Sequence, residues 1–146
     1  AWYREHSKKF AENNGGIPLP ALAFFHIALP EYKDALLEDK NRLFGCKGEM
    51  VCCPTTNSGF FTSVKECGDV MGIFVGHDHD NDYAVAYKEA LLAYGRYTGG
   101  KTVYNDLSSN GARVIVLHEG ERRFDTYIRV ANNEMESFVT FPNSFY

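Results

Sequence analysis

Two histidines and three carboxylates follow a short apolar run near the middle of the chain. The run covers residues 70–75, and the polar side chains directly after it are His77, Asp78, His79, Asp80 and Asp82. Imidazole and carboxylate groups together form the ligand set of divalent metals such as zinc, manganese and iron. The alternative is a polar surface turn, since aspartate is an ordinary turn residue. Two histidines at positions i and i+2 among carboxylates favour the metal site.

The apolar run predicts how these polar residues are positioned. Residues 70–75 carry no charge and lie between Gly68 and Gly76, which is typical of a short strand buried on both faces. In open sheets of such strands, ligands bind just beyond the carboxyl ends of the strands. Gly76 stands at that end, where its backbone can turn and approach a bound ion closely.

A second apolar strand and a helix complete a strand–helix–strand unit. The second strand is predicted over residues 21–27, with His26 as the one polar residue at its carboxyl end. Apolar residues at helical spacing predict a helix over residues 58–67. Such crossovers are right-handed and place their two strands parallel in one sheet. His26 is therefore expected to converge with His77 and His79, although it lies far from them in the sequence.

Turn residues and helical spacing predict the elements around this unit. One helix begins at Trp2 and ends at the Asn-Asn-Gly-Gly stop of residues 13–16. A short helix follows Pro30, and Asn57 is expected to cap the 58–67 helix. Residues 41–56 show no periodicity and are predicted to form a loop.

The rest of the chain predicts antiparallel pairs of strands. Residues 83–87 pair with 90–97 across a two-residue turn, and residues 112–118 pair with 122–130. In the last of these strands one face is expected to be buried, formed by Phe124, Thr126, Ile128 and Val130. From residue 131 onward the pattern predicts no element. His6 and His118 are expected to lie outside any site.

Composition limits the classes of function. The 146 residues are 45% hydrophobic, which predicts one domain over residues 1–146 with a sizeable core. The net charge is −4 without a basic patch, so no nucleic-acid partner is expected. No membrane partner is expected either, because no apolar run reaches the roughly 18 residues of a span. The cysteines lack Cys-x-x-Cys spacing, which argues against a zinc ribbon; a bridge from Cys46 to Cys52 or Cys53 stays open.

Two segments resemble motifs of the calcineurin-like metallophosphoesterases. Residues 76–79, Gly-His-Asp-His, are similar to the Gly-His-x-His motif of that superfamily. Residues 24–31, Phe-Phe-His-Ile-Ala-Leu-Pro-Glu, are similar to the preceding histidine motif in the branch related to purple acid phosphatases. Ala28 replaces the usual proline and concerns no ligand. The resemblance runs from about Trp2 to Val130.

This resemblance implies a fold and a metal site. The fold is α/β with a mixed sheet, the carboxyl-terminal half of a four-layer α-β-β-α sandwich. The site holds two divalent ions, manganese, iron or zinc, with His26 and His77 sharing one ion and His79 holding its neighbour. Two ions roughly 3.5–4 Å apart clamp a phosphate and lower the pKa of a bridging water. The family's catalytic histidine has no counterpart here, so the catalytic residues are unknown.

The motifs of the family's amino-terminal half, Asp-x-His, Gly-Asp-x-x-Asp and Gly-Asn-His-Asp/Glu, do not occur in these residues. The expectation is therefore a partial domain, whose parent protein hydrolyses phosphate esters and which alone binds metal weakly and is inactive. Uncovered apolar faces and strand edges would pair it with the missing amino-terminal half or with a second copy. The alternative is a degenerate homologue that binds a ligand or partner without catalysis.

Overall fold

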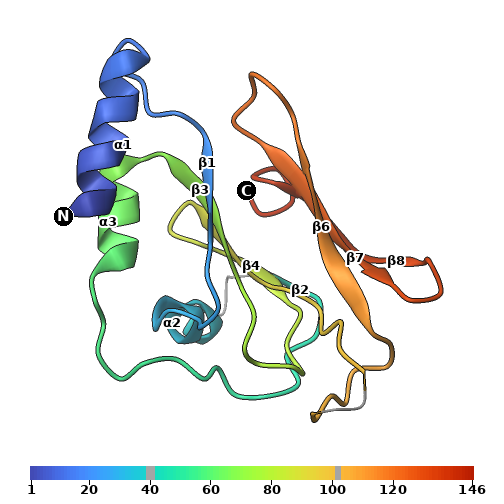
Figure 1. The fold of residues 1–146 in the computed structure, drawn as a ribbon. Helices are drawn as coiled ribbons and strands as arrows, with labels where there is room; N and C mark the ends of the chain where they lie inside the picture. Colours follow the sequence, from blue (N-terminus) through green and yellow to red (C-terminus); the bar gives the residue numbers. More distant parts are fainter. Residues whose placement is uncertain (39–41, 101–102) are drawn as a thin grey trace.

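The computed structural model of the chain describes residues 1–38, 42–100 and 103–146. Its strands form a five-stranded sheet, in the order β1-β3-β5-β4-β2, and a three-stranded sheet, in the order β6-β7-β8 (Figure 1). The elements in chain order are α1 (Trp2–Asn13), β1 (Ala21–Phe24), α2 (Glu31–Leu37), β2 (Leu43–Phe44), α3 (Phe60–Cys67), β3 (Val70–Val75), β4 (Ala84–Tyr87), β5 (Ala90–Tyr94), β6 (Gly111–Leu117), β7 (Phe124–Val130) and β8 (Met135–Phe141).

The predicted strand–helix–strand unit is confirmed. β1 and β3 are parallel neighbours, with Leu22 opposite Gly72 and Phe24 opposite Phe74. β1 ends at Phe24, earlier than the predicted 21–27 strand, whereas β3 covers residues 70–75 and is buried throughout. β5 lies on the other side of β3 and is also parallel to it, so three strands present their carboxyl ends at one edge.

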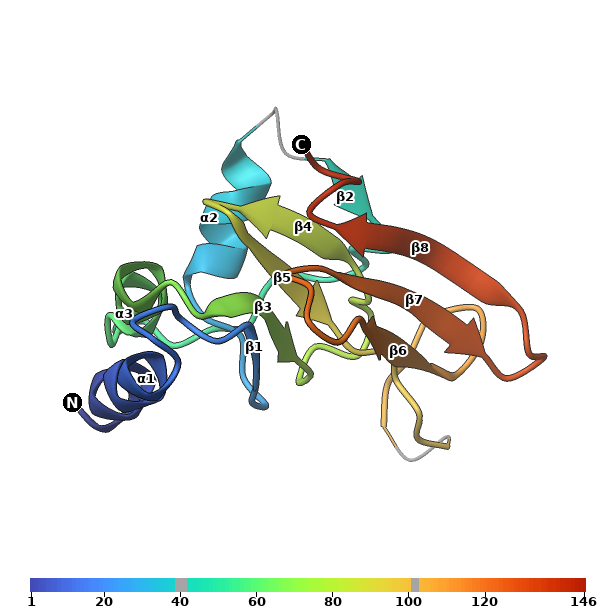
Figure 2. The ribbon, with the colours of Figure 1, turned by 90° about the horizontal axis from the view of Figure 1, so that it is seen from above.

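Apolar side chains alternate between two cores, one on each face of the five-stranded sheet. Ile73 and Leu92 pack with Val64 of α3 on the helical side. Phe74 and Leu91, one position away on the same strands, pack with Phe124 of the three-stranded sheet. Figures 1 and 2 show the resulting order of helices, five-stranded sheet and three-stranded sheet. Among the described residues, no helix has both the length and the apolar character that crossing a membrane requires.

Both predicted hairpins are present. β4 and β5 pair antiparallel across Lys88 and Glu89, whose φ angles of 44° and 64° are typical of the tight turn that suits a two-residue hairpin. β6 and β7 pair along their whole length. Every second residue of β7 is buried, from Phe124 to Val130, as the alternation predicts.

The structure corrects two predictions around α2 and α3. Residues 42–56, predicted as loop, contain the short strand β2, and residue 41 lies outside the described residues. The N-cap of α3 is Gly59, with a φ of 70°, and not Asn57. Asn57 instead accepts a hydrogen bond from Gly59 N at 2.8 Å and donates one to Glu31 Oε1 at 2.8 Å. Its side chain therefore ties the start of α3 to α2.

The strand β8 was not predicted. It pairs antiparallel with β7, and the register shifts between Thr126 and Ile128. Ser137 beside this shift has a positive φ of 52°. The irregularity breaks the strict alternation of buried and exposed residues, which is the signal that sequence reasoning uses for a strand.

Exposed apolar side chains are scattered over the chain, and two of them lie together at one edge of the sheets. Both faces of the central strands are covered, contrary to the expectation of uncovered sheet faces. β1 and β6, however, are edge strands of their sheets. Phe24 on β1 and Leu117 on β6 are each 64% exposed, and both line a hollow of about 310 Å³ between the sheets. The sandwich is therefore open beside β1 and β6.

We expect Phe124→Ala to destabilise the chain by about 3–5 kcal/mol, because the ring is fully buried between the sheets and its removal leaves a cavity. Phe138→Ala is the control, since that ring is 51% exposed on β8. Urea unfolding followed by fluorescence measures both free energies. Equal effects of the two substitutions would contradict the assignment of Phe124 to the core between the sheets.

Candidate metal centre

His26 and His77 meet where β1 and β3 end. Hydrogen bonding between the two strands continues past β1, from Phe25 N to Phe74 O at 3.2 Å and from Gly76 N to His26 O at 3.0 Å. Nδ1 of His77 consequently lies 3.4 Å from Nε2 of His26, with the two rings nearly perpendicular at 80°. The predicted convergence of these two histidines is therefore observed.

His77 has an unusual backbone. Its φ angle is 76°, in the left-handed region that residues with a Cβ rarely adopt. The next amide, Asp78 N, donates to Gly76 O at 3.0 Å and closes a tight turn around His77. Strained residues of this kind cluster at functional sites, where the surrounding structure holds them in place.

His79 lies on the same cavity, held by two tyrosines. Its ring stacks on Tyr104 at 4.5 Å between centroids and lies 4.8 Å from the ring of Tyr97. Nδ1 of His79 is 2.9 Å from the carbonyl oxygen of Tyr104. Because a carbonyl oxygen can only accept, Nδ1 carries the hydrogen in this contact and Nε2 is the nitrogen available to a candidate ion.

The donor set suits divalent ions. The cavity measures about 240 Å³, and its lining includes His26, His77 and His79. Two imidazoles on one tetrahedral ion, each about 2.0–2.1 Å from the metal, place their nitrogens roughly 3.4 Å apart. The His26–His77 separation of 3.4 Å matches this value. His79 lines the same cavity.

A different set of three side chains has its candidate ligand atoms within 4.8 Å of one another. The set consists of Cys52, His77 and Asp78, and not the three histidines. Sequence reasoning missed Cys52, because no spacing relates a residue of the 41–56 segment to residues 77 and 78. All four cysteines of the chain are free thiols, so the bridge that spacing left open is not formed.

The three carboxylates after β3 do not form a solvated surface turn. Asp78, Asp80 and Asp82 are only 3%, 8% and 2% exposed. Each accepts a hydrogen bond from a backbone amide of a distant segment: Asp78 from Cys52 at 3.0 Å, Asp80 from Asp106 at 2.5 Å, and Asp82 from Cys46 at 2.6 Å. These carboxylates hold the segments that wall the centre.

Two arginines that sequence reasoning missed complete this support. Arg96 forms a buried ion pair with Asp82 and donates from Nε to Ser109 O at 2.7 Å. Arg113 donates to the backbone oxygens of Asp82 and Tyr94. Burial lowers the pKa of Arg113 to about 10, and the nearby Asp82 carboxylate counteracts this shift. Arg96 follows β5, which is parallel to β3, so it lies at the same edge of the sheet as His77. Predicting that β5 is parallel to β3 would have placed Arg96 at the site from the sequence.

The remaining histidines lie outside the centre, as expected. Nδ1 of His6 is 2.8 Å from the carbonyl oxygen of Trp2 on the same helix. Nε2 of His118 is 2.8 Å from a carboxylate oxygen of Asp125 on the neighbouring strand. Both residues therefore serve as matched controls for the three histidines of the centre.

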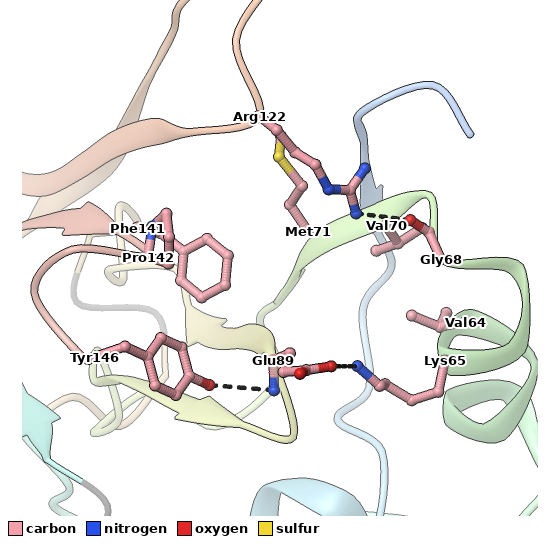
Figure 3. A pocket seen from close by; sticks show the side chains of 10 residues that line it. All are labelled: Val64, Lys65, Gly68, Val70, Met71, Glu89, Arg122, Phe141, Pro142 and Tyr146. Atoms are coloured by element: carbon pink, nitrogen blue, oxygen red, sulfur yellow. Dashed lines mark hydrogen bonds and ion pairs between the residues drawn. The ribbon is translucent and has the colours of Figure 1, made fainter. Parts of the chain in front are cut away.

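A larger cavity, of about 550 Å³, lies at the amino ends of β3 and β5, away from the histidines (Figure 3). Its charged side chains already have partners. Lys65 forms an ion pair with Glu89 at 2.9 Å, and Arg122 donates to the carbonyl oxygen of Gly68 at 2.6 Å. The smaller cavity, with its histidines, is the better candidate for chemistry.

We expect Arg96→Met to destabilise the chain by about 3–5 kcal/mol, because it leaves the Asp82 carboxylate buried without its charged partner. Arg123→Met is the matched control, since the ion pair of Arg123 with Glu121 is on the surface and should contribute little. Chemical denaturation of both variants provides the measurement. A similar loss of unfolding free energy in both variants would show that the buried Asp82–Arg96 pair contributes no more to stability than the surface pair.

A mixed sheet with histidines beyond the carboxyl ends of β1 and β3 agrees with the metallophosphoesterase class, and the chain is similar to proteins that are named as phosphatases. "Probable inactive purple acid phosphatase 29" of Arabidopsis thaliana is 35% identical over 128 residues, covering 84% of this chain. "Probable inactive purple acid phosphatase 14" of the same plant is 37% identical over 100 residues, or 64% of this chain. "Phosphatase DCR2" of Saccharomyces cerevisiae is 29% identical over 154 residues, covering 94% of this chain. The chain belongs to the calcineurin-like metallophosphoesterase superfamily, in the branch related to purple acid phosphatases.

The relatives are much longer than the region they share with this chain. The alignments cover 32% and 24% of the two plant proteins and 26% of the yeast phosphatase. No family model and no solved structure matches the chain. The comparisons therefore establish the family, and the activity of a whole protein is a separate proposal.

Proposed function

We propose that this chain supplies three histidine ligands to a two-metal site that hydrolyses phosphate esters. The observation that carries the proposal is the approach of His26 to His77 across two parallel strands, at the separation of two ligands on one ion. His79, with its Nε2 free, would hold the second ion. When bound, two such ions clamp a phosphate and lower the pKa of a water between them. Manganese, iron and zinc all accept this kind of donor set.

The chain's own residues bind and orient in this proposal. The carbonyl oxygen of Tyr104 holds His79 in one tautomer, which outer contacts of this kind do for metal-binding histidines. Arg96 lines the cavity, but its guanidinium is paired with Asp82. Arg96 is therefore not free to neutralise a bound phosphate, and that charge would have to be balanced by the ions that the histidines would hold.

We further propose that the remaining ligands come from an amino-terminal segment of the whole protein. Two neighbouring cations repel each other, and a bridging anionic ligand is needed to offset this repulsion. Asp78, Asp80 and Asp82 are buried and already engaged in hydrogen bonds that support the fold. The open edge at β1 and β6 is where such a segment would dock, covering Phe24 and Leu117. The short alignments to longer relatives support this reading.

A second candidate function is a non-catalytic module that binds a ligand or partner. It is favoured by the names of three plant relatives, each of which is called a probable inactive purple acid phosphatase. In that case the fold would be retained and turnover absent. The presence of all three expected histidines in this chain favours the catalytic proposal.

The test uses the whole protein that contains these residues, assayed on a chromogenic phosphate ester with manganese, zinc or iron. We expect turnover that His26→Ala, His77→Ala or His79→Ala lowers by at least about 100-fold, more than the loss of an outer contact would cause. His118→Ala is the control and should keep its activity. A folded, metal-loaded protein without turnover would support the non-catalytic binding module. Activity that survives His77→Ala would contradict the proposed metal site.

The 146-residue chain assayed alone should bind metal weakly and hydrolyse no ester, because it lacks the other ligands. Sedimentation of this chain, alone and mixed with the amino-terminal segment, tests the docking edge. We expect a mixed complex that Phe24→Asp and Leu117→Asp weaken. Self-association of the chain that the segment does not displace would instead indicate pairing of two copies.

A further inference from the structure

Cys52 lies beside the candidate metal centre, on the segment between β2 and α3. Its sulfur, a ring nitrogen of His77 and a carboxylate oxygen of Asp78 all lie within 4.8 Å of one another. Within the part of the chain that the structure describes, this is the one group of three or more histidine, cysteine, aspartate or glutamate side chains that is close enough to share an ion. Cys52 is exposed, and its thiol is free.

The backbone around Cys52 is held in place while its side chain is not. The amide of Cys52 donates to Asp78 Oδ2 at 3.0 Å. Val51 is 4% exposed and belongs to the core on the helical side of the sheet. Glu49 adds a second link, since its Oε1 accepts a hydrogen bond from Asp80 N at 2.8 Å. The thiol can therefore rotate about one bond without moving the segment that carries it.

Asp78 and Cys52 have different roles in the group. Oδ2 of the buried Asp78 also accepts a hydrogen bond from the Tyr94 hydroxyl at 2.6 Å. Burial, reinforced by this hydrogen bond, raises the pKa of Tyr94, so its hydroxyl remains a donor. Asp78 is thus engaged in supporting the loop. The exposed thiol of Cys52 is the group of the three, besides His77, that can turn toward an ion.

We propose that Cys52 binds, as a thiolate, the ion that His26 and His77 hold. The inference rests on the proposed metal site and adds a ligand to it. A thiolate about 2.3 Å and an imidazole about 2.0–2.1 Å from a tetrahedral ion lie roughly 3.6 Å apart. His26 is not a member of the group within 4.8 Å, so the exposed Cys52 side chain has to rotate toward the ion that His26 and His77 share. On binding, the thiol proton passes to solvent and a sulfur lone pair is donated to the ion, with no change of oxidation state.

A thiolate changes which metal this position prefers. Thiolates select zinc-like ions, whereas magnesium and manganese prefer oxygen ligands. A cysteine ligand added to the two imidazoles would therefore make the position held by His26 and His77 selective for zinc or cobalt over manganese. The position held by His79 lacks a thiolate ligand, so the two positions would prefer different metal ions.

The test is a cobalt(II) titration of the 146-residue chain followed by absorbance. Thiolate ligation produces a near-ultraviolet charge-transfer band, which imidazole ligands alone do not. We expect this band in the unmodified chain and its loss in Cys52→Ser, with cobalt affinity weakened at least roughly 10-fold. Cys53→Ser is the matched control, because Cys53 is half-buried and packs against the helical-side core. Circular dichroism confirms that each variant is folded.

The outcomes separate this inference from the proposed function. Cobalt that binds through His26 and His77 without the near-ultraviolet band would overturn thiolate ligation and leave the two-metal site standing. A band that needs Cys52 but persists in His26→Ala would support the thiolate and remove His26 from the shared ion. A band that survives Cys52→Ser, or a folded chain that binds no cobalt at millimolar concentration, would overturn the inference.

Discussion

Three buried carboxylates directly after β3 constrain the structure around them. A buried carboxylate is tolerated only where hydrogen bonds or an opposite charge replace its water. Asp78, Asp80 and Asp82 therefore require partners, and these come from segments far away in the chain. The segments before α3 and after β5 are brought against the loop in this way. These contacts hold the segments that form the walls of the candidate metal centre in place.

The second constraint is the register of the parallel strands. Leu22 lies opposite Gly72 and Phe24 opposite Phe74, and the same pairing continues to His26 and Gly76. A shift of one residue would turn every side chain of β1 to the other face and carry His26 away from His77. Gly72 permits close packing here, since a Cβ at this position would lie 3.0 Å from the ring of Phe124. Sheet packing and ligand placement thus depend on the same few contacts.

The sequence was sufficient for those parts of the fold that follow from local patterns. Apolar runs and a helix between them predicted that His26 and His77 share an edge, and alternation predicted the buried face of β7. The burial of Asp78 could not be predicted, because aspartate after a strand has the same local signature in a wet turn and in a buried one. Its partners Tyr94 and Cys52 are distant in sequence, and only the tertiary structure relates them.

The candidate ligands and the groups that stabilise the fold are separate sets of residues. His26 is exposed and His77 and His79 are half-buried, whereas Asp82 and Arg96 lie in the interior. Losing one histidine would remove a candidate ligand and leave the packed interior intact. In evolutionary terms, a single codon change can remove a candidate ligand while the lineage still inherits a folded protein. A scaffold of this kind can lose or gain such a side chain without an unfolded intermediate along the way.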